Sequence, residues 1–546
     1  MKRVLVLGGY GSFGARISEL LAKAGRFEVI VGGRNLDKAQ AHCRLRPDLG
    51  LTAARIDRDR GFGASLAEFR PWLVVDAVGP FQDATYEVAR LCIAAGCHYI
   101  DIADGRAFVE NFHQLDAEAR GAGVSLISGA SSVPALSSAV AVRLAEGLDT
   151  VGLVEGAITA SNRATVGQSV MQAILSYVGK PVGLRQAGRD IPARGWRGLR
   201  RQTFATSRRR PLAGRWVAIC DVPDLALLSD RLPGRPLVIF RAGVELAIQN
   251  AALWLLSWPV QWGWVADLRP LADVLDRLRR LTAGLGGDRS AMAARVVGLR
   301  GGDVVERRWT LIADHGQGPY TPCLAAPLLA LRLADGELAP GAYPAVGLLP
   351  LEAFEPDFNA LGFDTEIADL GPTRPLYRRV MRDDFGRLPP AVRDMHILAG
   401  AGLAEGRATV TRGTNPFARI VAKIMGFPPA GEDVPVTVRF VERDGWETWV
   451  RQFGASRFSS ELSQLGDLMV ERFGVLRFGF ELRGAPEGLS MHLRRWWFGP
   501  IPMPLPLGPK GVARETERDG RFHFDVPIAL PFVGPVVTYQ GWLARV

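Results

Sequence analysis

The chain has 546 residues, 48% of them hydrophobic, which is material for about three packed domains of a globular protein. Its net charge of +10 comes with 60 arginines and 6 lysines, a skew that genome base composition can produce as well as function, so the charge is poor evidence for nucleic-acid binding. We find no zinc spacing, no RNA-binding consensus and no helix-turn-helix, and we expect neither a nucleic-acid partner nor a metal site.

The first expected element is an apolar strand, residues 4–7, that runs directly into a glycine loop. The loop fits GxGxxG, and its expected cofactor-binding residues are Gly9, Gly11, Ser12, Phe13 and Gly14. Gly9 makes the tight turn, Gly11 lets a pyrophosphate approach the backbone, and Gly14 lets the following helix, residues 15–24, pack on the strand. Because the N–H groups at the helix start face the phosphates, this stretch predicts a dinucleotide site.

The second strand, residues 28–31, ends in Gly32-Gly33-Arg34-Asn35. An NAD site would offer Asp or Glu to the ribose hydroxyls here, whereas Arg34 can pair with a 2′-phosphate. The pattern therefore favours NADP over NAD, and the alternative for Arg34 is a solvated loop charge. Asn35, also expected at the cofactor, can cap a helix over residues 36–43.

Strands and helices keep alternating to about residue 135, which predicts an α/β domain with a doubly wound parallel sheet of the Rossmann type. The remaining strands are expected over residues 51–56, 72–78, 99–102 and 124–128, and the helices over 84–95 and 108–120. Ligands lie at the carboxyl ends of such strands. Further cofactor-binding residues are expected there: Asp57 at the adenine end, and Gly79, Pro80 and Phe81.

Two residues near the expected nicotinamide position, Tyr99 and Asp104, are candidate catalytic proton donors, because both lie near the end of a sheet strand. The alternatives are a core phenol for Tyr99 and a helix N-cap for Asp104.

The motifs GGYGSFG, GGRN, VGPF, AAGCHYIDIADG and SGASSVPALSS, in this order, resemble the saccharopine dehydrogenase-like oxidoreductases over about the first third of the chain. The resemblance implies an NADP-binding Rossmann domain at residues 1–135 and a mixed α/β substrate domain at residues 136–370, with the substrate bound between them. It does not imply saccharopine as the substrate. The remaining part, a β-rich α+β domain at residues 371–546, resembles a bacterial domain of unknown function found behind such domains.

In the second domain, a polar turn at residues 159–168 resembles the turn by which the family's second domain reaches the cofactor cleft. Asn162 and Thr165 are its candidate substrate contacts, and the alternative is that both cap the helix expected over residues 169–178. Further along, a strand over residues 303–313 extends the second sheet, and residues 348–361 return to support the first domain.

Two other features of this domain have open interpretations. Nine arginines and one acidic residue lie between positions 185 and 210, which indicates either a site for an anionic group or membrane surface, or a solvated hairpin. Residues 246–265 carry no charge and four tryptophans, three of them spaced along one helix face. This segment is interpreted as a buried or substrate-lining helix, a membrane-surface helix or a membrane span.

The last domain begins after a linker at residues 371–375. One helix is expected between Asn415 as N-cap and Gly426. Strands are expected over residues 434–440, 446–453, 475–482, 490–498, 521–528 and 536–543, and an extended loop over 499–509. The alternating aromatic residues indicate plain core or, as the alternative, a cavity for an apolar ligand.

We therefore predict an NADP-dependent oxidoreductase that acts on an unidentified small molecule of hydrophobic or lipid-like character. The alternative is a membrane-surface, lipid-binding or redox-sensing protein that binds NADP without turnover. Five scattered cysteines and the lack of a signal peptide predict a cytoplasmic location, with membrane-surface contact through residues 246–265 left open. The sequence also leaves the oligomeric state open.

Overall fold

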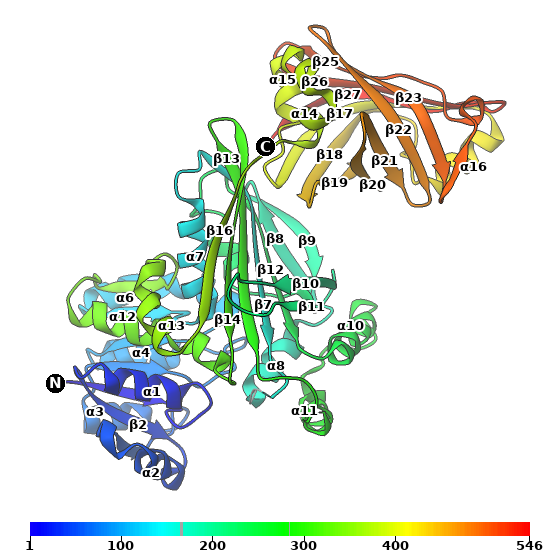
Figure 1. Cartoon of the computed structure of the whole chain (residues 1–546). Coiled ribbons are helices and arrows are strands. Elements are labelled where there is room, and N and C mark those ends of the chain that lie inside the picture. Colours follow the sequence, from blue (N-terminus) through cyan, green and yellow to red (C-terminus); the bar gives the residue numbers. More distant parts are fainter. Residues whose placement is uncertain (164–166, 283) are drawn as a thin grey trace.

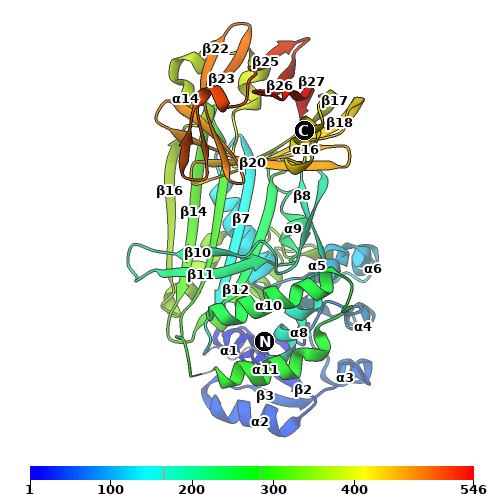
Figure 2. The same ribbon diagram turned by 90° about the vertical axis from the view of Figure 1, so that its right-hand side faces the viewer.

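The computed structural model describes residues 1–163, 167–282 and 284–546, and Figures 1 and 2 show it from two sides. The strands of the first sheet are β1 (Lys2–Leu7), β2 (Phe27–Gly33), β3 (Thr52–Arg55), β4 (Leu73–Asp76), β5 (His98–Asp101), β6 (Ser125–Ser128) and β15 (Gly341–Pro344). All neighbours in this sheet run parallel, in the order β15-β6-β5-β4-β1-β2-β3. This is a doubly wound sheet whose strand order reverses between β1 and β4, where such sheets bind their ligands.

The helices of this domain are α1 (Gly14–Lys23), α2 (Leu36–Leu45), α3 (Phe62–Phe69), α4 (Glu87–Ala94), α5 (Arg106–Glu110), α6 (Asp116–Gly121), α12 (Ala325–Ala334) and α13 (Glu355–Ala360). α1 turns Ile17 and Leu21, one helical turn apart, into the core. The single helix expected over residues 108–120 is wrong: a 3-10 turn between α5 and α6 brings Phe112 and Leu115 fully into the core. The predicted Rossmann fold class is confirmed.

The second sheet is mixed, and only its β7–β12 pair is parallel among the described strands. Its strands are β7 (Thr150–Ala160), β10 (Arg200–Phe204), β11 (Leu212–Ile219), β12 (Leu237–Val244), β13 (Ser290–Arg300), β14 (Asp303–Ala313) and β16 (Asp364–Thr373). Beside it lie the hairpin of β8 (Pro181–Gln186) and β9 (Arg189–Arg194) and the helices α7 (Ser137–Ala145), α8 (Gln168–Tyr177), α9 (Asp224–Leu227), α10 (Ala247–Gln261) and α11 (Ala272–Leu281). The predicted strand over residues 303–313 is confirmed as β14.

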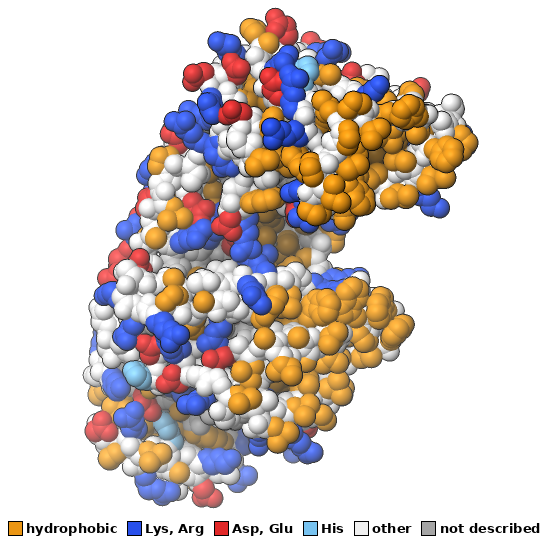
Figure 3. All heavy atoms as spheres, turned by 45° about the vertical axis from the view of Figure 1, so that its right-hand side comes forward, with side chains coloured by type: hydrophobic (Ala, Val, Ile, Leu, Met, Phe, Trp, Pro, Cys, Tyr) orange, Lys and Arg blue, Asp and Glu red, His pale blue; other side chains and the backbone are white. Residues whose placement is uncertain are grey.

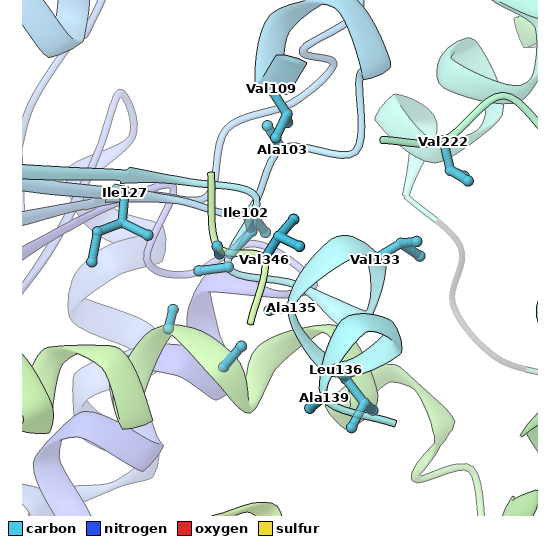
Figure 4. Packing of buried hydrophobic residues seen from close by; sticks show 14 of the residues in the cluster. Ile102, Ala103, Val109, Ile127, Val133, Ala135, Leu136, Ala139, Val222 and Val346 are labelled. Carbon is cyan, nitrogen blue, oxygen red and sulfur yellow. The ribbon is translucent and has the colours of Figure 1, made fainter. Parts of the chain in front are cut away.

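The first two sheets share one hydrophobic core. Figure 4 shows part of this core: Ile102 lies beside Val346, which follows β15, and Val133 lies on the side toward Val222, which follows β11. The chain also crosses back, because β15 pairs with β6 although it follows β14 of the second sheet. The chain's return to the first domain, which we expected over residues 348–361, thus begins slightly earlier in the sequence, at β15. A shared core and a crossing chain hold the two domains in a fixed relation.

The last part of the chain forms a barrel with its own hydrophobic core. Its elements are α14 (Leu376–Met381), α15 (Pro390–Met395), α16 (Pro416–Ile424), β17 (Ala401–Arg412), β18 (Gly431–Arg443), β19 (Trp446–Phe453), β20 (Ser456–Leu465), β21 (Leu468–Phe473), β22 (Leu476–Ala485), β23 (Gly488–Phe498), β24 (Ile501–Met503), β25 (Ala513–Arg518), β26 (Arg521–Leu530) and β27 (Gly534–Arg545). The strands are antiparallel in the order β22-β21-β20-β19-β18-β17-β27-β26-β25-β23-β24, and an additional β22–β23 pairing closes the ring. The β-rich class is confirmed, whereas part of the expected loop over residues 499–509 is strand β24, paired with β23.

Most arginines of the arginine-rich stretch pair with acidic residues, although several of them are exposed. Arg200 pairs with Glu155 at 3.0 Å, Arg208 with Asp364 at 2.8 Å, and further arginines of the stretch pair with acidic residues at positions 110, 314 and 405. These counterions neutralise most of the cluster. The structure therefore favours the solvated-hairpin interpretation over an anionic-group site.

The tryptophan-rich segment forms α10, which is 15 residues long. None of the helices in the described residues is both long and apolar enough to cross a membrane. One side of α10 packs inward through Leu253 and Ser257, while Ile248 and Leu255 on another side are exposed.

Candidate functional site

The glycine loop has the geometry that a pyrophosphate needs. A Cβ on Gly14 would lie 2.1 Å from the Gly8 carbonyl oxygen, so only glycine lets α1 pack this closely on β1. A Cβ on Gly9 would lie 2.9 Å from the Val6 carbonyl oxygen. Gly11 differs, because a Cβ there would meet a single atom, the Gly8 carbonyl oxygen at 3.1 Å, and otherwise open space. The loop is therefore tight on its inner side and open at Gly11, where Ser12 and Phe13 begin α1.

The exposed Arg34 follows β2, whose last residue packs against the Tyr10 ring. The Tyr10 ring packs on Gly33, where a Cβ would lie 2.3 Å from the ring, and its hydroxyl accepts a hydrogen bond from the Asn35 N–H at 3.0 Å. Arg34 is exposed and has neither an ion pair nor a hydrogen bond with any described residue. The Asn35 side chain accepts from the Lys38 N–H and caps α2, as predicted.

Asp57 and its neighbour Arg58 follow β3 at the same edge of the sheet. Asp57 is half-buried and accepts a hydrogen bond from the Asp59 N–H at 3.1 Å. Arg58 reaches the end of β4, where it pairs with the buried Asp76 at 3.1 Å and donates to the Val78 carbonyl oxygen. Burial raises the pKa of Asp76, although Arg58 opposes that shift. Our sequence reasoning missed Arg58, since β1 and β2 lie between β3 and β4 and only the fold brings these side chains together.

The loop after β4, in the first domain, contacts the second domain. The Gly79 carbonyl oxygen accepts a hydrogen bond from the Ser169 hydroxyl of α8 at 3.1 Å, and a cis peptide bond links Gly79 to Pro80. Phe81 is buried against Phe108, with ring centroids 5.5 Å apart. The predicted cofactor residues of this loop thus lie at the carboxyl edge of the sheet, next to the start of α8.

The two candidate proton donors occupy different surroundings. Tyr99 is 1% exposed, and its ring lies against Phe112 in the core, so a substrate has no route to it and the structure favours the core-phenol interpretation. Asp104 is half-buried and accepts a hydrogen bond from the Gln82 side chain at 3.0 Å. Burial raises the pKa of Asp104, so its carboxyl group keeps a proton to higher pH than an exposed aspartate. Asp104 also is not the N-cap of α5, since that position is Gly105.

A cavity of about 210 Å³ lies between the loop after β4 and the second domain. It is lined by Arg58, Pro80, Gln82, Asp83, Ala84, Gln172, Ser176 and Arg269. Gln82 therefore touches both the cavity and Asp104. Nearby, the Tyr177 hydroxyl and the Cys220 thiol lie 3.1 Å apart, and burial raises the pKa of both, that of Cys220 to about 12. None of these second-domain residues stood out in the sequence, because no motif surrounds them.

Asn162, a predicted substrate contact, does not line this cavity. The Asn162 side chain donates to the carbonyl oxygens of Thr282 and Leu285 at 2.5 and 2.9 Å, and it accepts from the Gln249 side chain at 3.0 Å. Both amide hydrogens are used, so the structure assigns Asn162 to holding β7 against α10 and the turn after α11 rather than to a substrate. It is not a helix cap either, because Gly167 is the N-cap of α8. Thr165 lies outside the described residues.

Comparison with known proteins agrees with the predicted resemblances. Residues 4–127 match the family model described as the saccharopine dehydrogenase NADP binding domain, and residues 388–543 match the one described as domain of unknown function (DUF4166). The N-terminal part of the chain is thus similar to nicotinamide-nucleotide-binding domains. No match is found among curated proteins.

Three solved structures illustrate the overall similarity. Apo saccharopine dehydrogenase (L-Glu forming) from Saccharomyces cerevisiae is 13% identical, covers 68% of this chain and 100% of its own, and has a TM-score of 0.47. Homospermidine synthase from Legionella pneumophila, in complex with NAD, is 10% identical, with coverage of 67% and 91% and a TM-score of 0.43. Amine dehydrogenase from Mycobacterium smegmatis is 16% identical, with coverage of 63% and 95% and a TM-score of 0.34.

Proposed function

We propose that this chain is an NADP-dependent oxidoreductase whose dinucleotide lies along the carboxyl edge of the first sheet. The observation that carries the proposal is the glycine loop, which is closed to any side chain at Gly14 and open at Gly11, directly before the start of α1. The match of residues 4–127 to an NADP-binding domain model supports the same class of cofactor.

The preference for NADP over NAD rests on Arg34. The Arg34 side chain is exposed, and no described acidic residue neutralises it. A 2′-phosphate at the end of β2 would give this cation the bidentate partner that it lacks.

When bound, the nicotinamide supplies or accepts a hydride. The chain's own residues hold the cofactor, exclude water and handle the proton. The cavity between Gln82 and Arg269 lies at the carboxyl end of β4, where the switch point of the sheet places the reacting ring. Asp104 is the candidate proton donor, since its pKa is raised by burial and Gln82 fixes its carboxyl group beside this cavity.

The test is fluorescence titration of the protein with NADPH and NADH. We expect Arg34→Ala to weaken NADPH binding about tenfold or more while NADH binding stays within about twofold of wild type. Arg44→Ala is the matched control, because Arg44 is equally exposed on the neighbouring α2 and lacks a partner among the described residues. If the wild-type protein binds neither nucleotide, the oxidoreductase proposal fails.

A second candidate, a membrane-surface protein that binds NADP without turnover, rests on α10 and α11. The side chains exposed on α10 and just after it include Ile248, Leu255 and Trp262, spaced seven residues apart on one helix face, and Trp264. α11 and its flanks expose Leu271, Val274, Leu278, Leu281 and Leu285, again on one face. Figure 3 shows these hydrophobic side chains gathered on the same face of the molecule as those of the barrel domain.

This apolar face suits the surface of a lipid bilayer. Tryptophan is favoured at the membrane interface, and Arg277 is exposed beside the patch to meet anionic headgroups. A membrane-surface location also favours a hydrophobic substrate for the oxidoreductase. Leu278→Asp combined with Leu281→Asp should reduce cosedimentation with phosphatidylglycerol vesicles about tenfold, whereas Leu45→Asp, at an exposed leucine on α2, should not. Oxidation of NADPH with extracted lipids then separates the two candidates, because only the enzyme consumes the nucleotide.

A further inference from the structure

The barrel domain encloses a cavity that the nucleotide site does not use. Ten strands form a closed ring, and barrels of this size are wider than an eight-stranded barrel that side chains can fill. The cavity measures about 290 Å³, near the lower limit of about 300 Å³ for small-molecule pockets. Its aromatic lining includes Phe427, Phe453, Phe478, Phe480, Trp449 and Trp496.

Many lining side chains on one wall are apolar but not fully buried. Phe478, Phe480, Met491, Leu493 and Ile528 on β22, β23 and β26 line the cavity and are only half-buried. In a closed core these residue types are usually buried completely. The ring thus keeps apolar surface inside that an apolar ligand would cover.

Arg451, Glu471 and Glu515, the charged residues of the lining that are not exposed, already have partners. Arg451 pairs with Glu471 at 3.0 Å, and Ser460 donates to the same carboxylate oxygen at 2.7 Å. Glu515, the other acidic residue of the lining, contacts the buried His396 at 2.6 Å. Lys510, the remaining charged residue of the lining, is exposed to solvent. A ligand carboxylate beside Glu471 and Glu515 would therefore find no unpaired buried cation and would lie near two acidic side chains.

The Glu471 carboxylate can accept a further hydrogen bond. Arg451 and Ser460 both use its Oε1 atom, and no described residue donates to its Oε2 atom. A hydroxyl group is uncharged and can donate to that oxygen. The cavity walls thus match an apolar chain with a hydroxyl head.

Access to the cavity passes apolar elements. Val421 and Met425 of α16 line the cavity, while Phe417, Ile420 and Ile424 on other positions of the same helix are exposed. Leu507, in the loop after β24, also both lines the cavity and is exposed. Figure 3 shows this apolar surface on the barrel domain. An apolar chain that enters there meets these apolar side chains.

We propose that the barrel binds one uncharged, hydroxyl-bearing molecule with a single apolar chain, of the chemical class of long-chain alcohols and monoacylglycerols. The proposal does not depend on the nucleotide site.

The experiment is displacement of the uncharged dye N-phenyl-1-naphthylamine from the full-length protein by 1-dodecanol, 1-monododecanoylglycerol and dodecanoate, each below its critical micelle concentration. The three compounds have the same chain length and differ in their heads. We expect the alcohol and the acylglycerol to displace the dye at about tenfold lower concentration than the carboxylate. No displacement, or tighter binding of dodecanoate to the wild-type protein, would overturn the proposal.

Two variants locate the site. Glu471→Gln leaves Arg451 without its counterion, so dodecanoate should gain about tenfold in affinity relative to 1-dodecanol. Leu493→Glu places a charge on the cavity wall and should abolish dye binding, whereas Arg495→Glu, an exposed position on the same strand outside the lining, should not. Thermal unfolding checks that each variant folds, and the wild-type comparison stands if one does not. NADPH titration of the same variants should be unchanged, so a failure here is distinct from a failure of the nucleotide site.

Discussion

Alanine at Gly14 and at Gly11 should separate the structural role of the glycine loop from its role in binding. A Cβ on Gly14 would lie 2.1 Å from the Gly8 carbonyl oxygen and 2.7 Å from the Gly8 carbonyl carbon, and neither backbone atom can rotate away. Such overpacking costs about 3 kcal/mol, while the better helix propensity of alanine returns about 1 kcal/mol. We expect Gly14→Ala to lower the free energy of unfolding by about 2 kcal/mol.

Gly11→Ala should show the opposite behaviour. The new methyl group would meet only the Gly8 carbonyl oxygen at 3.1 Å, so the free energy of unfolding should change by less than about 0.5 kcal/mol. The same methyl group would stand where the pyrophosphate approaches, and NADPH affinity should fall at least about tenfold. Urea unfolding and NADPH titration measure the two effects. A folded Gly11→Ala protein that binds NADPH as tightly as wild type would refute the assignment of this loop to the pyrophosphate.

Other expectations concern buried polar groups. Burial raises the pKa of Asp101 to about 7, so between about pH 4 and 7 the native state holds a proton that the unfolded chain has lost. The free energy of unfolding should therefore fall as the pH rises through this window, and it should fall less steeply in Asp101→Asn. Thermal unfolding at a series of pH values measures both slopes. Burial alone would raise the pKa of Glu155, but the arginines paired with it hold it at about 2. Glu155→Gln leaves Arg200 and Arg241 without a counterion and should lower the free energy of unfolding by about 3 kcal/mol, and an unchanged urea midpoint would be the contrary result. Asn162→Ala should cost about 1–3 kcal/mol in urea unfolding and leave NADPH affinity intact, and weaker NADPH binding in the folded variant would contradict its structural role.

The first domain could be predicted from sequence because its signals are local. The strand before Gly9, the glycine spacing and the cap at Asn35 each involve residues within a few positions of one another, and the structure contains all of them. The same holds in the barrel for α16, where Asn415 caps the helix and Pro416 opens it. The closure of the barrel was not predictable, because the β22–β23 pairing completes a ring whose other strands are set by the whole domain.

The predictions from sequence were wrong for residues whose partners lie far away in the sequence. Asn162 reads as a polar turn residue, and its hydrogen-bond partners at positions 249, 282 and 285 are unknown until the chain has folded. Arg200 and Arg208 read as a solvated or anion-binding cluster, and their counterions Glu155 and Asp364 lie far away in sequence. Whether such a charge or amide is structural or functional depends on its protein partners, and sequence does not reveal those partners.

The crossing of the chain at β15 has a consequence for synthesis on the ribosome. The edge of the nucleotide-binding sheet beside β6 stays unpaired until residues 341–344 have emerged, long after the glycine loop and β1 to β5. An open strand edge can pair with other nascent chains and aggregate. The first sheet therefore cannot be completed until β15 has been translated, after most strands of the second sheet. A fragment that ends near residue 135 should have an exposed strand edge at β6 instead of a complete sheet.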